Sequence, residues 1–585
     1  MLQNTAVREL LNRTGMDAKM EALAKLEALT EQAEADLVRE KAKGPLRRAV
    51  KAWKRGNYPR TAQLALEAVD LDQNYAYAYH LLGMALERMG YLHKALVTYE
   101  RAFELEPDNA DFMLDLGMTA WGMQMREVAE KLFRRYIAMR PESPLGYNNL
   151  ASILADSNQS TIAVEVLRDA IHRMPSEPIL WNTLATLLAE DGRVQESFVF
   201  YEEALRLDPA YFRCFHNLGY AYLHLGMMEK TLDAAERALE RLPDPRERLE
   251  ARYMRSVSLM GMGRLEEGFE EYEVRIDPLF HAHVPHMLKA PLWQGEPLEG
   301  KRLLVCGEQG LGDEIMLANA VPDLARAVGP AGKLQIAVNY RLVPLFKRSF
   351  PDAEVGVFED KTHVNPDGQI TVRYVPFATK EGEPDYYIRM GSTLRLLRKH
   401  IEDFPDQALL KPDRERVAAY RAQLRAKDDR PTIGICWRSM RLVDKRGKYY
   451  SALDQWGPVL TLPGVRFVNV QYGNCAQELV ETCRKLGTEI EEIDGLDLTN
   501  DIDGAAALSA ALDLVISPST ASAAIAGAVG TEVWFVNPCR MWTQLGTDRV
   551  PFYPKTRAFS PPGFADWPEV IARVGSELQT WLSNR

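Results

Sequence analysis

The chain has 585 residues, a net charge of −11 at neutral pH, and 46% hydrophobic and 26% charged residues. This length predicts three or four domains, and the composition is that of an ordinary soluble globular protein. The acidic balance argues against nucleic acid as the main partner, because binding to phosphates needs a basic surface. The six cysteines show no metal-ligand spacing and favour a reducing compartment over a disulfide framework.

The N-terminus has no apolar segment of the kind found in signal peptides. The longest stretch of low charge, residues 514–531, is interrupted by Ser-Pro-Ser-Thr. It therefore predicts a buried strand and helix rather than a membrane span. We expect a cytoplasmic protein with no membrane span.

The first half of the chain repeats every 34 residues, with prolines at positions 107, 141, 175, 209 and 243. A small residue recurs in a second phase, at Gly83, Gly117, Ala151, Ala185 and Gly219. A large residue recurs in a third phase, at Tyr99, Phe133, Leu167 and Tyr201. This is the tetratricopeptide repeat (TPR) pattern, in which paired helices approach closely at the small residue and the large residue fills the gap. About seven repeats are predicted over residues 44–279, as an all-α solenoid.

Residues 1–43 predict an N-terminal helical segment whose apolar stripe, Leu26, Leu29, Ala33 and Leu37, caps the array or pairs with another chain. The default function of such a solenoid is to hold a peptide or a protein partner in its groove. Four polar residues share one phase on the first helices of successive repeats: Asp115, Asn149, Thr183 and Asn217. They either bind the backbone of an acceptor protein or are polar residues of the helix surface, and the pattern leaves both open.

After Pro278 the period ends, and strands alternate with helices. Apolar strands are predicted at residues 302–306, 432–437, 465–471 and 512–517. The alternation predicts parallel sheets in two Rossmann-like halves, 280–410 (with a linker) and 411–585. Ligands of such folds bind at the carboxyl ends of the strands.

Two loops at such strand ends are candidate sites. "GEQGLGD" (307–313) matches neither a dinucleotide fingerprint nor a P-loop, and it places Asp313 in the first turn of a helix, where composition alone favours a plain cap. "SPSTAS" (517–522) brings hydroxyls to a helix N-terminus, a natural anion site, although capping explains them too. A cationic run that includes Arg438 and Lys448 follows another strand and favours an anionic ligand.

Other candidates have plainer interpretations. His281, His283 and His286 lie in the linker without a carboxylate or cysteine that would complete a metal site, so we expect no metal. Asp501 and Asp503 are predicted to cap a helix. Trp542 and Tyr553 are predicted to be packing residues.

Several segments resemble a known family: "GEQGLGDEIMLA", "IGICWRS", "NVQYGNC", "LDLVISPSTASAAIAGAVGTEVWFV" and "WTQLGTDRVPFYPKTRAF". They are similar to bacterial TPR proteins with a C-terminal GT-B glycosyltransferase domain, related to heptosyltransferases and O-GlcNAc transferases. The resemblance covers nearly all of residues 44–585 and points in particular to flagellin-modifying members. It implies an α/β GT-B enzyme that transfers a nonulosonic acid, such as pseudaminic acid, from a CMP-linked donor to Ser or Thr of flagellin held by the repeats.

The resemblance also implies roles for residues. A Gly-Asp that supplies the catalytic base of heptosyltransferases matches Gly312–Asp313, so Asp313 becomes the candidate base, with Glu308 and Glu314 as fallback carboxylates. A metal-independent transferase must stabilise its leaving phosphate with cations and a helix N-terminus. The donor-binding residues that we expect are Gly310, Gly312, Arg438, Lys448, Gln471, Tyr472, Ser519, Thr520, Ser522 and Asn537.

The chain departs from the family at the second loop. Related domains carry Asp-Thr and, four residues after the Thr, a His; this chain has Ser519–Thr520 and then Ala524. A mechanism in which that acid and imidazole contact the donor is therefore in doubt. Two alternatives stay open: a TPR adaptor whose GT-B domain has lost turnover, and a transferase with a saccharide acceptor.

Overall fold

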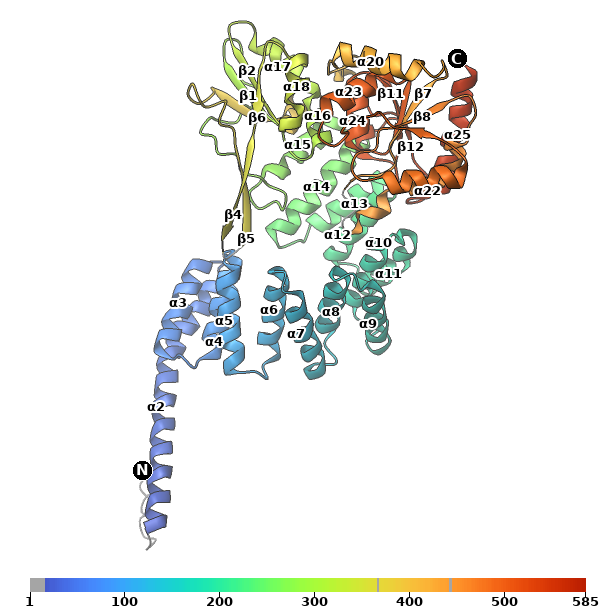
Figure 1. Cartoon of the computed structure of the whole chain (residues 1–585). Helices are drawn as coiled ribbons and strands as arrows, with labels where there is room; N and C mark the ends of the chain where they lie inside the picture. Colours follow the sequence, from blue (N-terminus) through green and yellow to red (C-terminus); the bar gives the residue numbers. More distant parts are fainter. Residues whose placement is uncertain (1–15, 366–367, 441–443) are drawn as a thin grey trace. The chain divides into compact units, whose positions relative to one another are not determined.

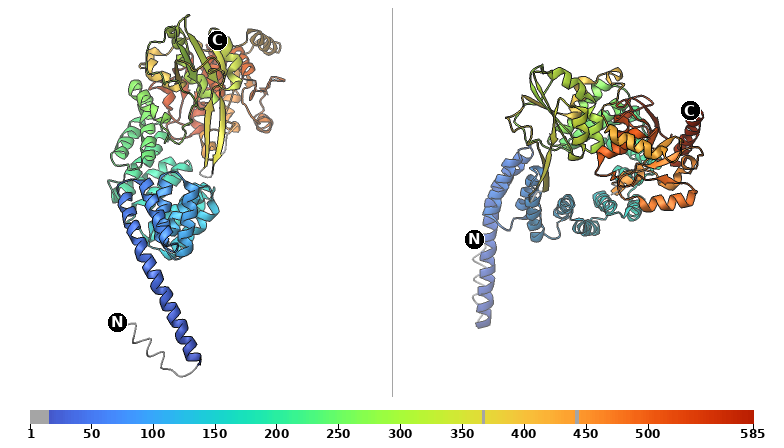
Figure 2. Two further views of the ribbon diagram at one scale, coloured as in Figure 1. Left: turned by 90° about the vertical axis from the view of Figure 1, so that its left-hand side faces the viewer. Right: turned by 45° about the horizontal axis from the view of Figure 1, so that its top comes forward.

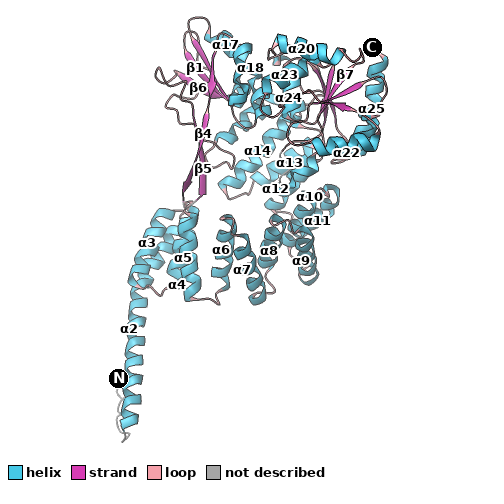
Figure 3. Cartoon of the chain, in the orientation of Figure 1, coloured by secondary structure: helices cyan, strands magenta, loops and turns pink. Residues whose placement is uncertain are grey.

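The computed structural model describes residues 16–365, 368–440 and 444–585 (Figure 1). The chain divides into two compact units. The first comprises the chain up to Thr183 with Val364–Gln369, and the second comprises Leu184–His363 and Ile370–Arg585. The described part of the first unit is built mainly from helices, whereas the strands of the two larger sheets belong to the second (Figure 3).

The repeat array consists, in the described residues, of seven antiparallel helix pairs, as the period predicts. Successive pairs of the first unit lie side by side (blue to teal in Figures 1 and 2). The helices are α2 (Met16–Trp53), α3 (Tyr58–Leu71), α4 (Ala76–Arg88), α5 (Leu92–Leu105), α6 (Ala110–Gly122), α7 (Arg126–Met139), α8 (Pro144–Asp156), α9 (Ser160–Arg173), α10 (Pro178–Glu190), α11 (Val194–Leu207), α12 (Phe212–His224), α13 (Met228–Leu239), α14 (Pro245–Gly261) and α15 (Leu265–Glu271).

The small and large residues of the repeat pack as predicted. A Cβ added to Gly83 would lie 2.8 Å from the ring of Tyr99, and one added to Gly117 would lie 2.7 Å from Phe133. Both rings are fully buried. The glycines therefore provide the room that these aromatic side chains occupy between the two helices of a pair, and larger residues there would separate the helices.

Helix α2 begins well before the first repeat. Its C-terminal part packs through Ala49 and Ala52 against α3 and α4. The apolar stripe nearer its N-terminus is exposed in this chain, at 44% for Leu26, 65% for Leu29 and 59% for Leu37. The stripe therefore does not cap the array within this chain, which leaves pairing with another chain as a prediction.

The second unit contains two parallel sheets, confirming the predicted strand–helix alternation. The strands of the chain are β1 (Arg302–Cys306), β2 (Lys333–Val338), β3 (Glu354–Val357), β4 (Glu359–Asn365), β5 (Gly368–Tyr374), β6 (Tyr386–Arg389), β7 (Thr432–Ile435), β8 (Arg466–Asn469), β9 (Ile490–Glu491), β10 (Leu514–Ser517), β11 (Glu532–Val536) and β12 (Thr556–Phe559). Strands β4 and β5 pair with each other and belong to neither parallel sheet. The helices are α16 (Leu311–Leu317), α17 (Val321–Val328), α18 (Val343–Ser349), α19 (Met390–Leu397), α20 (Arg414–Arg425), α21 (Gly457–Leu460), α22 (Ala476–Leu486), α23 (Ile502–Ala511), α24 (Ala521–Ala528) and α25 (Trp567–Ser583).

The strand order locates the expected ligand crevices. The first sheet has the order β3-β2-β1-β6 and the second β12-β11-β10-β7-β8-β9, with all neighbours parallel. Counted from its own first strand, the second sheet has the doubly wound order that reverses between β7 and β10. The loops after these two strands carry Arg438 and Ser519–Thr520, so the reversal point coincides with two of the predicted loops.

The repeats and the sheets share one hydrophobic core. A single buried cluster contains Met260 and Phe269 from the last helix pair, Val305 and Ile336 from the first sheet, and Val515 from the second. Residue 280, predicted as the start of the α/β region, is thus not a break in packing. The last repeats and both sheets form one folded unit.

Candidate functional site

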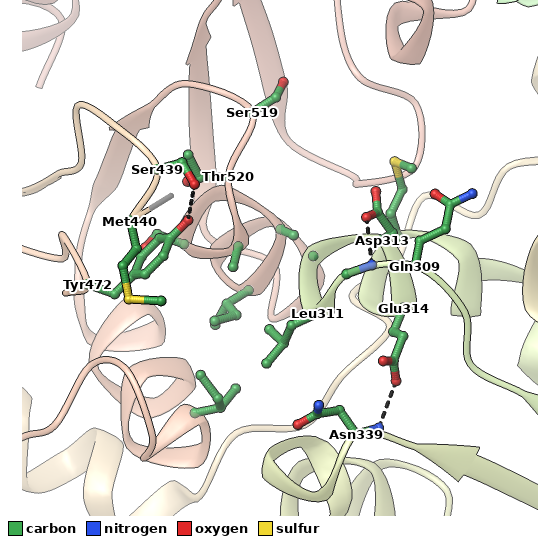
Figure 4. Close-up of a pocket in the computed structure, with 18 of the residues that line it drawn as sticks. Gln309, Leu311, Asp313, Glu314, Asn339, Ser439, Met440, Tyr472, Ser519 and Thr520 are labelled. Carbon is green, nitrogen blue, oxygen red and sulfur yellow. Dashed lines mark hydrogen bonds between the residues drawn. The ribbon is translucent and has the colours of Figure 1, made fainter. Parts of the chain in front are cut away.

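A cavity of about 810 Å³ opens at the carboxyl ends of the two sheets in the second unit. It is lined from one side by Gln309–Glu314, which follow β1, and from the other by Ser519–Ser522, which follow β10 (Figure 4). The size suits a nucleotide or a small sugar donor. Eight predicted site residues line it: Gly310, Gly312, Asp313, the fallback carboxylate Glu314, Tyr472, Ser519, Thr520 and Ser522.

Asp313 lies in the first turn of α16, and its Oδ2 accepts a hydrogen bond of 3.0 Å from the backbone N–H of Gly310. The predicted cap is therefore present. The same carboxyl also lines the cavity, and burial raises its pKa above the usual range, with a further contribution from the charge of Glu308. A carboxylate with a raised pKa is a better proton acceptor, so the cap and the base are compatible roles for one side chain.

Glu314 is the neighbouring carboxyl and also lines the cavity. It is 1% exposed, and its Oε2 accepts a 2.8 Å hydrogen bond from the backbone N–H of Asn339. Burial raises the pKa of Glu314 to about 8. Its side chain is therefore largely protonated at neutral pH, which suits a hydrogen-bond donor better than a base.

Glu308 occupies a different environment. Its Oε1 accepts 2.8 Å and 2.7 Å hydrogen bonds from Arg275 and from the backbone N–H of Gly391. Burial alone would raise the pKa of Glu308, but the charge and hydrogen bonds of Arg275 hold it below its usual value. Glu308 is not among the residues lining the cavity. Because its carboxylate is fully engaged in an internal ion pair, the structure does not favour it as a base.

The second loop forms the N-terminus of α24. Thr520 is the N-cap residue, yet its side chain makes no capping hydrogen bond; its hydroxyl lies 3.0 Å from that of Ser517. Ser519 donates to Oδ1 of Asn537 at 3.0 Å, and Ser522 donates to the carbonyl of Val470 at 2.7 Å. Ser519, Thr520 and Ala521 all line the cavity. Hydroxyl groups and the N-terminus of a helix therefore face the cavity together, and this combination suits the binding of an anion.

The two loops meet at a glycine. A Cβ on Gly312 would lie 3.3 Å from Cα of Ala521, so the start of α16 approaches the start of α24 closely. Across the cavity, Tyr472 donates a 3.4 Å hydrogen bond to Ser439, and burial raises the pKa of Tyr472 to about 12 (Figure 4). The phenol is therefore a hydrogen-bond donor at neutral pH.

Four predicted donor-binding residues do not line the cavity. Arg438 pairs with Glu478 at 2.9 Å and donates to the carbonyl of Asn474, and Lys448 donates to the carbonyl of Glu190 at 2.7 Å. The structure therefore gives these two cations intramolecular partners outside the cavity, and their contact with an anionic ligand stays a prediction.

The other two, Gln471 and Asn537, are buried and act behind the cavity. Oε1 of Gln471 accepts from the backbone N–H groups of Trp437 and Arg438, each at 3.1 Å, which fixes the turn after β7. Oδ1 of Asn537 accepts a 3.0 Å hydrogen bond from the hydroxyl of Ser519. Both hold cavity-lining loops in position instead of facing the cavity.

The four predicted groove residues make contacts between or within helices. Asp115 pairs with His80 at 2.7 Å, and Thr183 donates to Asn148, which itself donates to Asn149 at 2.9 Å. Asn217 donates to Thr186 at 3.2 Å. These bonds join first helices of neighbouring repeats, which favours the helix-surface interpretation; binding of an acceptor backbone stays a prediction.

Several cavity residues could not be found from the sequence. Arg341, Asp360 and Arg373 line the cavity although no motif indicates them. Trp542 and Tyr553 pack against the hydrophobic core, as predicted, and in addition line the cavity. Arg373 and Asp360 pair across the β4–β5 hairpin at 2.7 Å, far from any motif. By contrast, Asp501 caps α23 as predicted, by accepting from the backbone N–H of Gly504, while Asp503 pairs with Arg348 at 2.7 Å.

Comparison with known proteins gives the family. Tetratricopeptide repeat models match residues 76–109 and 148–212. Protein FlbA of Caulobacter vibrioides is 38% identical over 540 residues, covering 92% of this chain and 90% of FlbA. The chain belongs to the FlbA family.

Solved TPR structures are also similar to parts of the chain. A thermophilic TPR protein of Thermus thermophilus is 22% identical, covers 32% of this chain and 99% of its own, and has a TM-score of 0.29. A TPR protein from Parabacteroides merdae is 13% identical, covers 40% of this chain and 91% of its own, and has a TM-score of 0.34.

The described residues contain neither a membrane-spanning helix nor a cluster of metal ligands. None of their helices combines the length and the low polarity that crossing a bilayer requires. Nor do three or more His, Cys, Asp or Glu side chains among them gather closely enough to hold a metal ion.

Proposed function

We propose that this FlbA-family protein is a protein O-glycosyltransferase of the GT-B type, which transfers a sugar from a nucleotide donor to Ser or Thr of a protein held by the repeats. One observation carries the proposal: a carboxyl with a raised pKa, Asp313, and a hydroxyl-rich helix N-terminus, Ser519–Ser522, line the same cavity. The cavity lies where ligands bind in doubly wound sheets.

The two groups fit the two charge changes of glycosyl transfer. As the acceptor oxygen bonds to the anomeric carbon, its proton passes to Asp313. The bond from that carbon to the donor phosphate breaks at the same time, and the phosphate leaves with the electron pair. The N-terminus of α24 and the hydroxyls of Ser519 and Thr520 then stabilise the phosphate charge.

The repeat array supports a protein acceptor. A solenoid joined to the cavity domain raises the concentration of its bound protein near the cavity. The cavity itself therefore needs to recognise few residues around the acceptor hydroxyl. By resemblance, we propose flagellin as the acceptor, in the cytoplasm, and a CMP-linked nonulosonic acid as the donor. A saccharide acceptor would leave the array without a role.

An adaptor without turnover is the second candidate. It is favoured by Ser519 and Ala524, which stand where related domains have an acid and a histidine, and by the intramolecular partners of Arg438 and Lys448. In that case the cavity would bind a nucleotide weakly or not at all.

A thermal-shift panel with CMP, UDP and GDP tests the proposal. A nucleotide at 100 times its dissociation constant adds about 2.7 kcal/mol of stability. We expect a shift with CMP that is lost in Thr520→Val, whereas Thr580→Val, at an exposed hydroxyl of α25, retains it. A shift with UDP alone would change the donor class, and the absence of any shift would favour the adaptor.

A further inference from the structure

The cavity has three wall segments that contact the last repeats of the array, either directly or through the residues next to them. They are Gln309 after β1, Tyr450 between β7 and β8, and Met541–Thr543 after β11. These segments are far apart in sequence and belong to two different sheets. Each of them, or a residue next to it, has its own contact with the repeat residues of the second unit, 184–276, so these repeats contact the cavity wall at three separate places.

The first contact fixes the backbone immediately before Tyr450. Its two preceding residues both reach the repeats: Nζ of Lys448 donates to the carbonyls of Ala189 and Glu190, at 3.3 Å and 2.7 Å, at the end of α10. The hydroxyl of Tyr449 lies 2.8 Å from Nε2 of His224 at the end of α12. A lysine on helix C-terminal carbonyls is a favourable cap, so this contact ties Tyr450 to two successive repeats.

The second contact holds Met541–Thr543. A Cβ on Gly226, in the turn after α12, would lie 2.8 Å from Cβ of Arg540 and 2.9 Å from its backbone N and O. A Cβ on Gly546 would lie 3.0 Å from the backbone N of Gly263, in the turn after α14. The segment that carries Trp542 is therefore pressed against the turns of two repeats, with no room for a side chain between them.

The third contact involves Gln309. Its φ of 64° is unfavourable for a residue with a side chain. Nε2 of Gln309 donates a 2.9 Å hydrogen bond to the hydroxyl of Tyr272, which follows α15 and is buried. The end of the array thus holds the backbone that leads into Gly310 and Asp313 in an otherwise unfavourable conformation.

We propose that the last repeats are a regulatory part of the cavity: a conformational change in the repeats of the second unit (residues 184–276) is transmitted through these three contacts and changes the ligand affinity of the cavity. Binding to the array and binding to the cavity are then linked, each changing the other by the same factor. The inference rests on the proposed function only in taking a nucleotide as the cavity ligand.

The turn glycines provide a matched test. Gly90 and Gly226 occupy the same position in turns four repeats apart, and both have positive φ, 85° and 68°. A Cβ on Gly90 meets nothing within 4 Å, whereas one on Gly226 meets Arg540. Gly90→Ala and Gly226→Ala therefore introduce the same kind of backbone strain, but only the second displaces Arg540, the residue before the cavity-lining Met541–Thr543.

The measurements are hydrogen exchange of the full chain without ligand, and CMP affinity. In Gly226→Ala we expect at least tenfold faster exchange in residues 539–546 and at least tenfold weaker CMP binding, with changes below twofold in Gly90→Ala. Equal effects of the two variants, or a Gly226→Ala variant with wild-type exchange and affinity, would overturn the inference.

A milder variant guards against misfolding. Tyr449→Phe removes only the hydroxyl that meets His224, and we expect faster exchange in residues 447–450 with an unchanged Tm; unchanged exchange would contradict the inference. If the wild-type chain binds none of CMP, UDP or GDP, the proposed function fails. The ligand-free exchange of Gly226→Ala and Gly90→Ala then still decides whether the repeats control the cavity walls.

Discussion

Glu314 offers a sharp test of the cavity electrostatics. The variant Glu314→Gln keeps the size of the side chain and an oxygen that can accept from Asn339, but it has no charge at any pH. Burial raises the pKa of Glu314 from 4.5 to about 8 in the folded protein. Between these values the folded state binds more protons than the unfolded state, so the stability of the wild-type chain falls as the pH rises.

The size of the effect follows from the two pKa values. Each pKa unit corresponds to about 1.4 kcal/mol, so ionisation of Glu314 removes at most about 4 kcal/mol by pH 8. For a second unit of roughly 400 residues this lowers the Tm by about 5 °C. At pH 5 the wild-type chain and the variant should melt within about 1 °C of each other, and at pH 8 the variant should be the more stable.

The assay is thermal unfolding followed by scanning calorimetry from pH 5 to pH 8. Glu402→Gln, at an exposed carboxylate, is the control and should follow the wild-type curve at every pH. Wild-type and Glu314→Gln curves that run parallel over this range would refute the reasoning, because they would mean that Glu314 is ionised at no cost in the folded state.

Three further predictions concern the site. Asp313→Asn should lower transfer to a protein acceptor at least 100-fold, since the amide can still accept from Gly310 but cannot take a proton; donor binding by calorimetry should be unchanged, and unchanged turnover would remove Asp313 from the mechanism. Gly312→Val should abolish the nucleotide-induced thermal shift, because its branched side chain would overlap the start of α24; a wild-type shift would contradict this. Arg438→Gln should lower the Tm by about 2 °C, because the carbonyl of Asn474 loses this donor and Glu478 keeps only the indole N–H of Trp437, while CMP affinity measured by calorimetry stays within threefold. A large loss of affinity at unchanged Tm would restore its predicted contact with the ligand.

Motif reasoning located short segments of chain correctly, whereas their function stays a proposal. The Gly-Asp loop and the Ser-Pro-Ser-Thr loop both line the cavity, because a strand end and the following turn are placed together by local geometry. It was less successful with long side chains. Arg438 follows a strand at the right edge of the sheet, yet its guanidinium turns toward Glu478 on α22, which no spacing in the sequence indicates.

The sequence by itself determined the repeats and the parallel sheets, because both follow from periods of hydrophobic and small residues that are local in the chain. Gly83 and Tyr99 are 16 residues apart and meet because a helix pair brings them together. Only the tertiary structure decided which polar groups share the cavity and which hold it in place. Those choices depend on contacts such as Arg275 with Glu308 and Lys448 with the end of α10, between segments whose separation in the chain carries no periodic signal.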